Sequence, residues 1–130
     1  MTIRLRYHIL TLLWAFFILV LCGIPGQHIP RLAFIDWLRP DKIVHLFLFG
    51  VLSFLLINTF RQQLLLIFLN HHPKIYSILI STVYGIVIEL LQAYVFINRS
   101  GEVFDAVADT VGALIGVWVY NYWAKRTAKS

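Results

Sequence analysis

The sequence predicts an all-α fold, a single integral membrane domain of four transmembrane helices over residues 1–130. Of the 130 residues, 60% are hydrophobic and 13% are charged, whereas soluble domains carry about a quarter charged residues. Four apolar runs approach the length of about 20 residues that a helix needs to cross a bilayer. The basic residues behind the net charge of +5 lie near the ends of these runs. This placement indicates membrane anchoring and not nucleic-acid binding.

Residues that stop helices separate the four predicted spans. The spans cover about residues 9–24, 43–60, 75–96 and 103–123. Pro25–Gly26 ends the first run, and Arg61 ends the second. Cys22, the one cysteine of the chain, excludes an intrachain disulfide. Because Leu21 precedes it and no A-x-A-like site follows, the first run is predicted to be a retained helix; a lipoprotein signal is the weaker alternative.

Two connecting segments carry further helical patterns. Between Pro30 and Pro40, apolar residues recur at helical spacing with a tryptophan beside them. This pattern predicts a short helix lying in the membrane interface. Although Arg61, Gln62 and Gln63 end the second span, residues Leu64–Leu69 could continue its helix along the membrane surface, before a turn at His71, His72 and Pro73.

The distribution of basic residues predicts that both termini lie in the cytoplasm. An even number of spans puts the two ends of the chain on one side. That side would hold Arg4, Arg6, Arg61, Lys74, Lys125, Arg126 and Lys129, and the other Arg31, Arg39, Lys42 and Arg99. Seven against four satisfies the positive-inside rule. All six acids then lie toward the outer face, so a functional site is expected there.

Asp41 and His45 are four residues apart and therefore share a helix face at the outer end of the second span. A carboxylate in this position can orient an imidazole for acid–base work. Asp41 could equally cap the helix, with His45 packed against a local partner. The pair by itself does not distinguish these possibilities.

Glu89 and Gln92 share a face of the third span. An ionisable group inside a membrane is costly and is normally turned inward. Glu89 could be a neutral acid, could be kept ionised by Lys42 or Arg99, or could form an interhelical hydrogen bond that holds the bundle together.

Asp105 and Asp109 lie one turn apart on the fourth span. Asp105 could simply favour the positive end of its helix, while Asp109 lies deeper. Gly112 and Gly116 form a G-x-x-x-G pattern, which indicates close helix packing more than self-dimerisation. Metal binding by Asp41, His45, Glu89, Asp105 and Asp109 is possible, but no recognised metal-binding spacing is present and Lys42 beside them argues against it. Neither a metal site nor a cofactor is therefore predicted.

Arg99, beside Ser100–Gly101, could clamp an anionic headgroup or carboxylate, or could be an ordinary interfacial arginine. Ser100 is the one hydroxyl placed to act as a nucleophile, and no base is evidently paired with it. Whether the chain is an enzyme is therefore left open.

Together these motifs resemble the VanZ-like family of small bacterial membrane proteins. The resemblance covers about the second to fourth spans and depends on DKIVHLFLFGVLSF (Asp41–Phe54) and on Glu89–Gly116. The family's D-K-x-x-H corresponds to Asp41, Lys42 and His45, its E-x-x-Q to Glu89 and Gln92, its R-x5-D to Arg99 and Asp105, and its glycines to Gly112 and Gly116. Where the family usually has asparagine, this chain has Asp109, an additional titratable group.

The resemblance implies a role in the cell envelope, in a family named for a protein associated with teicoplanin resistance. We expect a pocket toward the outer leaflet that binds or processes an anionic amphiphile, such as an envelope lipid or a lipoglycopeptide. The residues expected to handle protons are Asp41, His45, Glu89 and Asp109, and those expected to bind are Lys42, Gln92, Arg99 and Asp105. A non-catalytic, structural or proton-linked helper subunit is the alternative. Membrane lipids are the expected partners, and nucleic acid is not.

Overall fold

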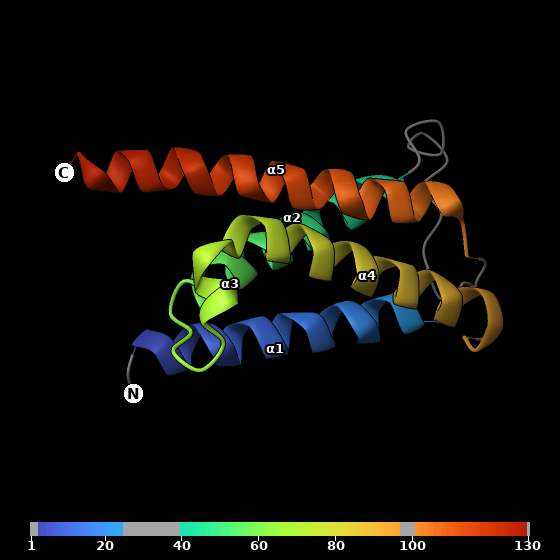
Figure 1. The fold of residues 1–130 in the computed structure, drawn as a ribbon. Coiled ribbons are helices and arrows are strands. Elements are labelled where there is room, and N and C mark those ends of the chain that lie inside the picture. The colour runs from blue at the N-terminus through green and yellow to red at the C-terminus, as the bar shows by residue number, and fades with distance from the viewer. Residues whose placement is uncertain (1–2, 25–39, 97–100, 130) are drawn as a thin grey trace.

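The protein is a helical bundle (Figure 1). The computed structural model describes residues 3–24, 40–96 and 101–129. Its helices are α1 (Ile3–Gly23), α2 (Pro40–Phe60), α3 (Ile67–His71), α4 (Pro73–Tyr94) and α5 (Val103–Ala128). All but α3 are long and apolar enough to cross a membrane. No strand occurs in the described ranges, so the predicted all-α fold with four candidate transmembrane helices is confirmed.

The helix boundaries differ from the predicted ones mainly at the ends of the chain. Helix α1 begins at Ile3 and α5 continues to Ala128. The additional residues of α5 include Ala124, Lys125 and Arg126, all of which have high helix propensity. The interfacial helix predicted between Pro30 and Pro40 lies outside the described residues.

The predicted continuation of α2 through residues 64–69 is wrong. The backbone N–H groups of Gln62 and Gln63 donate to the carbonyls of Thr59 and Phe60, three residues back, at 3.2 and 3.1 Å. Such bonds tighten the last turn and end a helix. The chain then leaves the helix and forms α3 as a separate short element before α4.

The four long helices run up and down, so both ends of the chain lie at the same end of the bundle (Figure 1). Helix α2 is central: it packs most extensively against α5 and also contacts α4 and α1. The beginning of α2, the end of α4 and the beginning of α5 therefore meet at the end opposite the termini.

The contact between α2 and α5 depends on glycines. A Cβ atom on Gly112 would lie 2.5 Å from the carbonyl oxygen of Leu46, and one on Gly116 would overlap the carbonyl oxygen of Gly50. The G-x-x-x-G pattern thus lets two backbones of the same bundle approach closely. This agrees with the packing interpretation of the sequence.

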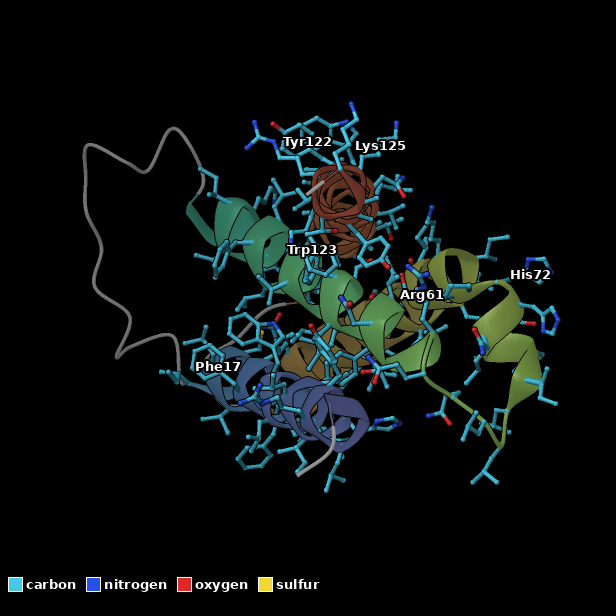
Figure 2. All side chains as sticks on the ribbon, turned by 90° about the vertical axis from the view of Figure 1, so that its left-hand side faces the viewer. Phe17, Arg61, His72, Tyr122, Trp123 and Lys125 are labelled. Atoms are coloured by element: carbon cyan, nitrogen blue, oxygen red, sulfur yellow. The ribbon has the colours of Figure 1, made fainter. Side chains whose placement is uncertain are left out.

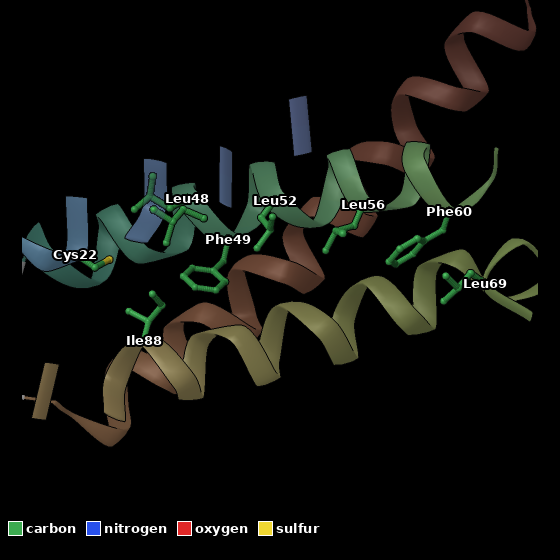
Figure 3. Packing of buried hydrophobic residues seen from close by; sticks show 9 residues of the cluster. Cys22, Leu48, Phe49, Leu52, Leu56, Phe60, Leu69 and Ile88 are labelled. Carbon is green, nitrogen blue, oxygen red and sulfur yellow. The ribbon is translucent and has the colours of Figure 1, made fainter. Parts of the chain in front are cut away.

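A cluster of buried apolar side chains fills the space among α1, α2, α3 and α4 (Figure 3). Its members are Ile18, Cys22, Leu48, Phe49, Leu52, Leu56, Phe60, Leu69 and Ile88. The outward faces of the long helices are also apolar, with Leu12, Phe16 and Trp118 each more than 60% exposed. Apolar side chains on both the inner and outer faces are typical of helices surrounded by lipid.

Polar side chains join the helices at several points. Thr11 and Thr59 share a hydrogen bond of 2.8 Å between α1 and α2, and Ser53 and Ser77 share one of 3.0 Å between α2 and α4. At the end that carries the termini, Arg61 bonds the hydroxyl of Tyr120. Figure 2 looks at this end, where Arg61, His72, Trp123 and Lys125 are labelled. Basic and aromatic side chains therefore gather there.

Candidate functional site

His45, Glu89 and Asp109 meet at the end of the bundle opposite the termini. His45 lies five residues after the start of α2, Glu89 five before the end of α4, and Asp109 six after the start of α5. At 1.5 Å per residue, each is about 8–9 Å from the end of its helix. Three helices thus bring three polar side chains to one depth, and we refer to these residues as the buried cluster.

The buried cluster is compact and almost closed to solvent. His45 Nδ1 lies 2.7 Å from Asp109 Oδ1 and 3.9 Å from Glu89 Oε1. His45, Glu89 and Asp109 are 3%, 7% and 0% exposed. The imidazole also stacks on Phe49 of the next helical turn, with ring planes 4° apart. Packing on one face and a carboxylate at Nδ1 therefore fix the orientation of the ring.

Two carboxylate oxygens of the buried cluster have no hydrogen-bond partner. Glu89 Oε2 accepts the backbone N–H of Glu102 at 2.8 Å, whereas Glu89 Oε1 and Asp109 Oδ2 are buried without a partner. A Cβ atom on Gly85 would lie 2.5 Å from Asp109 Oδ2, so the absence of a side chain there makes room for the carboxylate. Buried polar atoms normally have partners, which makes these two oxygens notable.

Lys42 pairs with acids at the end of the bundle instead of with Glu89. Its Nζ lies 2.7 Å from Asp105 Oδ1 and 3.0 Å from Glu102 Oε2. Asp105 is buried and Glu102 is about half exposed. Of the two cations that the sequence offered as a counterion for Glu89, Lys42 is thus engaged elsewhere, and Arg99 lies outside the described residues.

Gln92 faces away from the buried cluster, toward α1. Its Nε2 donates to the backbone carbonyl of Cys22 at 3.1 Å, and the side chain is 1% exposed. Because α1 ends at Gly23, that carbonyl is one of the last four that lack a partner within their own helix. Gln92 therefore fastens the end of α1. The side chain of Asp41 lies outside the described part of the structure.

An elongated groove lies between α4 and α5, next to the buried cluster. Its volume is about 570 Å³ and its walls are mostly apolar. Glu89, Glu102 and Gly101 line it, together with Thr82, Ile86, Leu90, Ala93, Tyr94, Val103, Ala106, Val107, Thr110 and Val111. Thr82 and Thr110 share a hydrogen bond of 3.2 Å toward its deep end. Glu89 therefore belongs to both the groove and the buried cluster.

The buried cluster has the groups needed for two kinds of chemistry. A histidine between two carboxylates can accept and pass a proton. In addition, one ligand atom from each of His45, Glu89 and Asp109 lies within 4.8 Å of the others, a grouping that could hold a metal ion. The arrangement is polar, enclosed and next to an apolar groove.

Sequence reasoning missed Glu102 and Gly85 as parts of this region. Glu102 contributes its N–H to Glu89 and its carboxylate to Lys42, although no motif of the sequence includes it. Gly85 is one turn before Glu89 on α4, and only its position against Asp109 reveals its importance. The one signal in the sequence was that Gly85, a residue without a side chain, lies four residues before Glu89, an acid within an apolar run.

The sequence profile of the VanZ/LLP1 family matches residues 7–124, which is most of the chain. No curated protein and no solved structure matches it. The match includes all of α2 and α4, most of α1 and α5, and every residue of the buried cluster. The chain therefore belongs to the VanZ-like family.

Proposed function

We propose that this VanZ-like membrane protein binds an envelope amphiphile, with an acyl chain in the α4–α5 groove and the polar end beside Glu89 and Glu102. The observation that supports this most is the continuity of an apolar groove with a buried polar cluster. An amphiphile needs an apolar surface for its chain and a polar surface for its headgroup, close enough together for one molecule to contact both. Glu89 lines the groove and lies beside His45, so it connects the two surfaces.

The length of the groove suits one chain of one leaflet. On α4 the lining residues extend from Thr82 to Tyr94, which is about 18 Å at 1.5 Å per residue. One leaflet of the hydrocarbon core is about 15 Å thick, half of the usual ~30 Å. The hydrogen bond between Thr82 and Thr110 near the deep end of the groove would then lie close to the tip of the acyl chain.

Whether the groove would favour an anionic ligand depends on Arg99. Lys42 is 24% exposed and already contacts Glu102 and Asp105, so it brings no net positive charge to the groove. An anionic headgroup would therefore need Arg99, three residues before Glu102 in the chain. The sequence favours an anionic amphiphile, such as an envelope lipid or a lipoglycopeptide, and we keep this ligand class in the proposal. Substitution of Arg99 tests it.

If the bound amphiphile is also processed, the buried cluster would handle the proton. His45 is oriented by Asp109 at 2.7 Å and faces Glu89 at 3.9 Å. An imidazole between two carboxylates can take a proton from a ligand group at the groove and hold it. This part of the proposal is separate from binding.

We also propose that the protein lies in the bacterial cytoplasmic membrane with both termini in the cytoplasm. The end with the termini carries Arg61, Lys74, Lys125, Arg126 and Lys129, in keeping with the positive-inside rule. The groove and the buried cluster would then open toward the outer leaflet. Teicoplanin-type ligands would reach the protein from that side.

Binding can be tested in vesicles with a phosphatidylglycerol that carries a photoreactive group on its acyl chain. Crosslinks in the wild-type protein should map to the groove, between Ala93 and Val107. Ala106→Trp, which fills the groove, should reduce crosslinking about tenfold, the equivalent of about 1.4 kcal/mol. Leu114→Trp is the matched control, because Leu114 is 50% exposed on the same helix and does not line the groove. Equal loss in both variants, or none in Ala106→Trp, would exclude the groove as the binding site.

The anionic character of the ligand has its own test. Wild type and Arg99→Ala are compared for binding of phosphatidylglycerol, of teicoplanin and of zwitterionic phosphatidylcholine. Weaker binding of only the two anionic ligands supports the proposal. Equal binding of all three by both proteins would count against an anionic ligand while leaving the groove itself in place.

A second candidate function is a non-catalytic helper subunit whose polar groups hold helices together. The side chains that bridge helices favour it, including the Tyr84 hydroxyl on the Ala15 carbonyl at 2.6 Å and Gln92 on that of Cys22. Glu89→Gln and Asp109→Asn distinguish the two functions. A structural role tolerates both isosteres, whereas a site that depends on charge or protonation loses its activity with either.

A further inference from the structure

We propose that the buried cluster is a binding site for one divalent transition-metal cation, with Zn²⁺ as the best-suited ion. The ligands would be an imidazole nitrogen of His45 and one carboxylate oxygen each from Glu89 and Asp109. This proposal does not depend on the amphiphile, because none of its evidence involves the groove.

The spacing of the ligand atoms fits a common centre. Ligands at about 2.0–2.1 Å from a tetrahedral Zn²⁺ lie roughly 3.3 Å from one another. The two distances from His45 Nδ1, 2.7 Å to Asp109 Oδ1 and 3.9 Å to Glu89 Oε1, bracket this value. All three ligand atoms fall within 4.8 Å of one another. Small side-chain adjustments therefore suffice, and His45 would present the lone pair of its ring nitrogen to the ion.

The unpartnered oxygens point independently to a missing positive charge. Glu89 Oε1 and Asp109 Oδ2 are buried without a hydrogen bond, in side chains that are 7% and 0% exposed. Leaving buried carboxylate oxygens without a partner costs free energy. A divalent ion would bind Glu89 Oε1 directly and match the charge of both carboxylates.

Among the described residues, the cations near the buried cluster do not supply enough positive charge for its two carboxylates. Lys42 is held by Glu102 and Asp105, which leaves His45 as the one group that can carry a positive charge beside Glu89 and Asp109. Even a protonated imidazole matches only one of these two carboxylates. Buried charges in proteins are normally paired or bound to a metal, and among the described residues the second carboxylate has no cation of its own.

The donor set favours Zn²⁺ over the hard cations. Mg²⁺ and Ca²⁺ prefer oxygen ligands, whereas imidazole suits Zn²⁺ and neighbouring transition metals. Three protein ligands leave a fourth position of the ion available, as in zinc sites that also bind water or a ligand. The ligands come from α2, α4 and α5, so an ion here would also cross-link three helices.

The test uses the full chain, purified in detergent, stripped with EDTA and dialysed against Zn²⁺. We expect about one Zn²⁺ per chain by elemental analysis. Glu89→Gln and His45→Gln, which keep the approximate shape but remove a ligand, should each weaken Zn²⁺ binding at least tenfold in competition with a chromophoric chelator. Circular dichroism and gel filtration verify that each variant is folded.

The histidines at the other end of the bundle provide the control. His71 and His72 lie at the end of α3 and the start of α4, and the double variant His71→Gln/His72→Gln should bind Zn²⁺ as the wild type does. Absence of stoichiometric Zn²⁺ in the wild type would overturn the proposal. So would binding that survives both Glu89→Gln and His45→Gln, or that disappears in the His71/His72 variant.

A second measurement needs no variant of the buried cluster. X-ray absorption at the zinc edge of the wild-type protein should indicate one imidazole and oxygen ligands at about 2.0–2.1 Å. Two or more imidazoles, or a fully hydrated ion, would overturn the assignment even if the variants failed to fold.

Discussion

His45 on α2 and Asp109 on α5 form a buried contact, with Nδ1 and Oδ1 2.7 Å apart. The two residues are 64 positions apart in the chain, and their helices are the pair that packs most extensively. The glycines of α5 allow that close packing. The contact thus depends on the close approach of the α2 and α5 backbones, and it pairs the His45 ring with one of the two oxygens of Asp109.

Removing His45 alone should destabilise the protein strongly. His45→Ala leaves the Asp109 carboxylate at 0% exposure without its partner, and breaking a buried pair in this way costs about 3–5 kcal/mol. The double variant His45→Ala/Asp109→Asn removes the unpaired charge and should recover part of that loss. The free energy of unfolding in mixed detergent micelles measures both.

Asp109→Asn alone is the matched control for this comparison. It keeps an oxygen that can accept from His45 and changes little in volume, so it should cost about 1 kcal/mol or less. If His45→Ala and the double variant were equally unstable, the loss would come from the cavity and not from the unpaired carboxylate.

Gln92 should hold the end of α1 against α4. Gln92→Leu replaces the amide with an apolar side chain of similar size and leaves the Cys22 carbonyl without this donor, so the end of α1 should open more often. Cys22, 3% exposed and the one cysteine of the chain, reports on this directly. We expect its alkylation by a maleimide to become about tenfold faster, which corresponds to roughly 1.4 kcal/mol.

The control for the labelling experiment is Tyr94→Ala on the same helix. Tyr94 is 84% exposed, and its removal should leave the labelling rate of Cys22 unchanged. A rate that did not change in Gln92→Leu either would mean that the hydrogen bond to the carbonyl does not fasten α1.

The four long helices could be predicted because each is a local property of about 20 apolar residues. The errors occur where local hydropathy is uninformative. Lys125 and Arg126 are polar, yet they extend α5 because they favour helix. Leu64 and Leu65 are apolar, yet they do not continue α2, because the tight turn at Gln62 and Gln63 ends it.

The site could be predicted in part, since acids inside apolar runs are costly and stand out. The partner of each side chain could not be predicted. Glu89 and Gln92 are three residues apart, which separates them by about 60° around the helix. That rotation is enough to turn Glu89 toward His45 and Gln92 toward Cys22. Which neighbour a side chain of α4 faces depends on how α1, α2 and α5 are arranged around that helix. The spacing of residues along the chain does not predict this arrangement.

Gly112 should tolerate no side chain. In Gly112→Ala the new Cβ would lie 2.5 Å from the Leu46 carbonyl oxygen, and overpacking of this kind costs about 1–3 kcal/mol. Gly23→Ala is the matched control, because its Cβ would meet only the ring of Phe96 at 3.5 Å. The free energy of unfolding in micelles should fall in Gly112→Ala and change little in Gly23→Ala. No loss in Gly112→Ala would mean that α2 and α5 can move apart without penalty, and an equal loss in both variants would mean that the effect is not specific to this contact.

The proposed orientation predicts which end of α5 faces the cell exterior. Val103 begins this 26-residue helix and Lys129 directly follows it. The helix is about 39 Å long and therefore exceeds the ~30 Å hydrocarbon core. In a Cys22→Ala background, a membrane-impermeant maleimide applied to intact spheroplasts should label Val103→Cys. It should label Lys129→Cys only after lysis, because positive charge is retained in the cytoplasm. The reverse pattern would put the groove and the buried cluster toward the inner leaflet, where the amphiphile would have to be a cytoplasmic-side lipid.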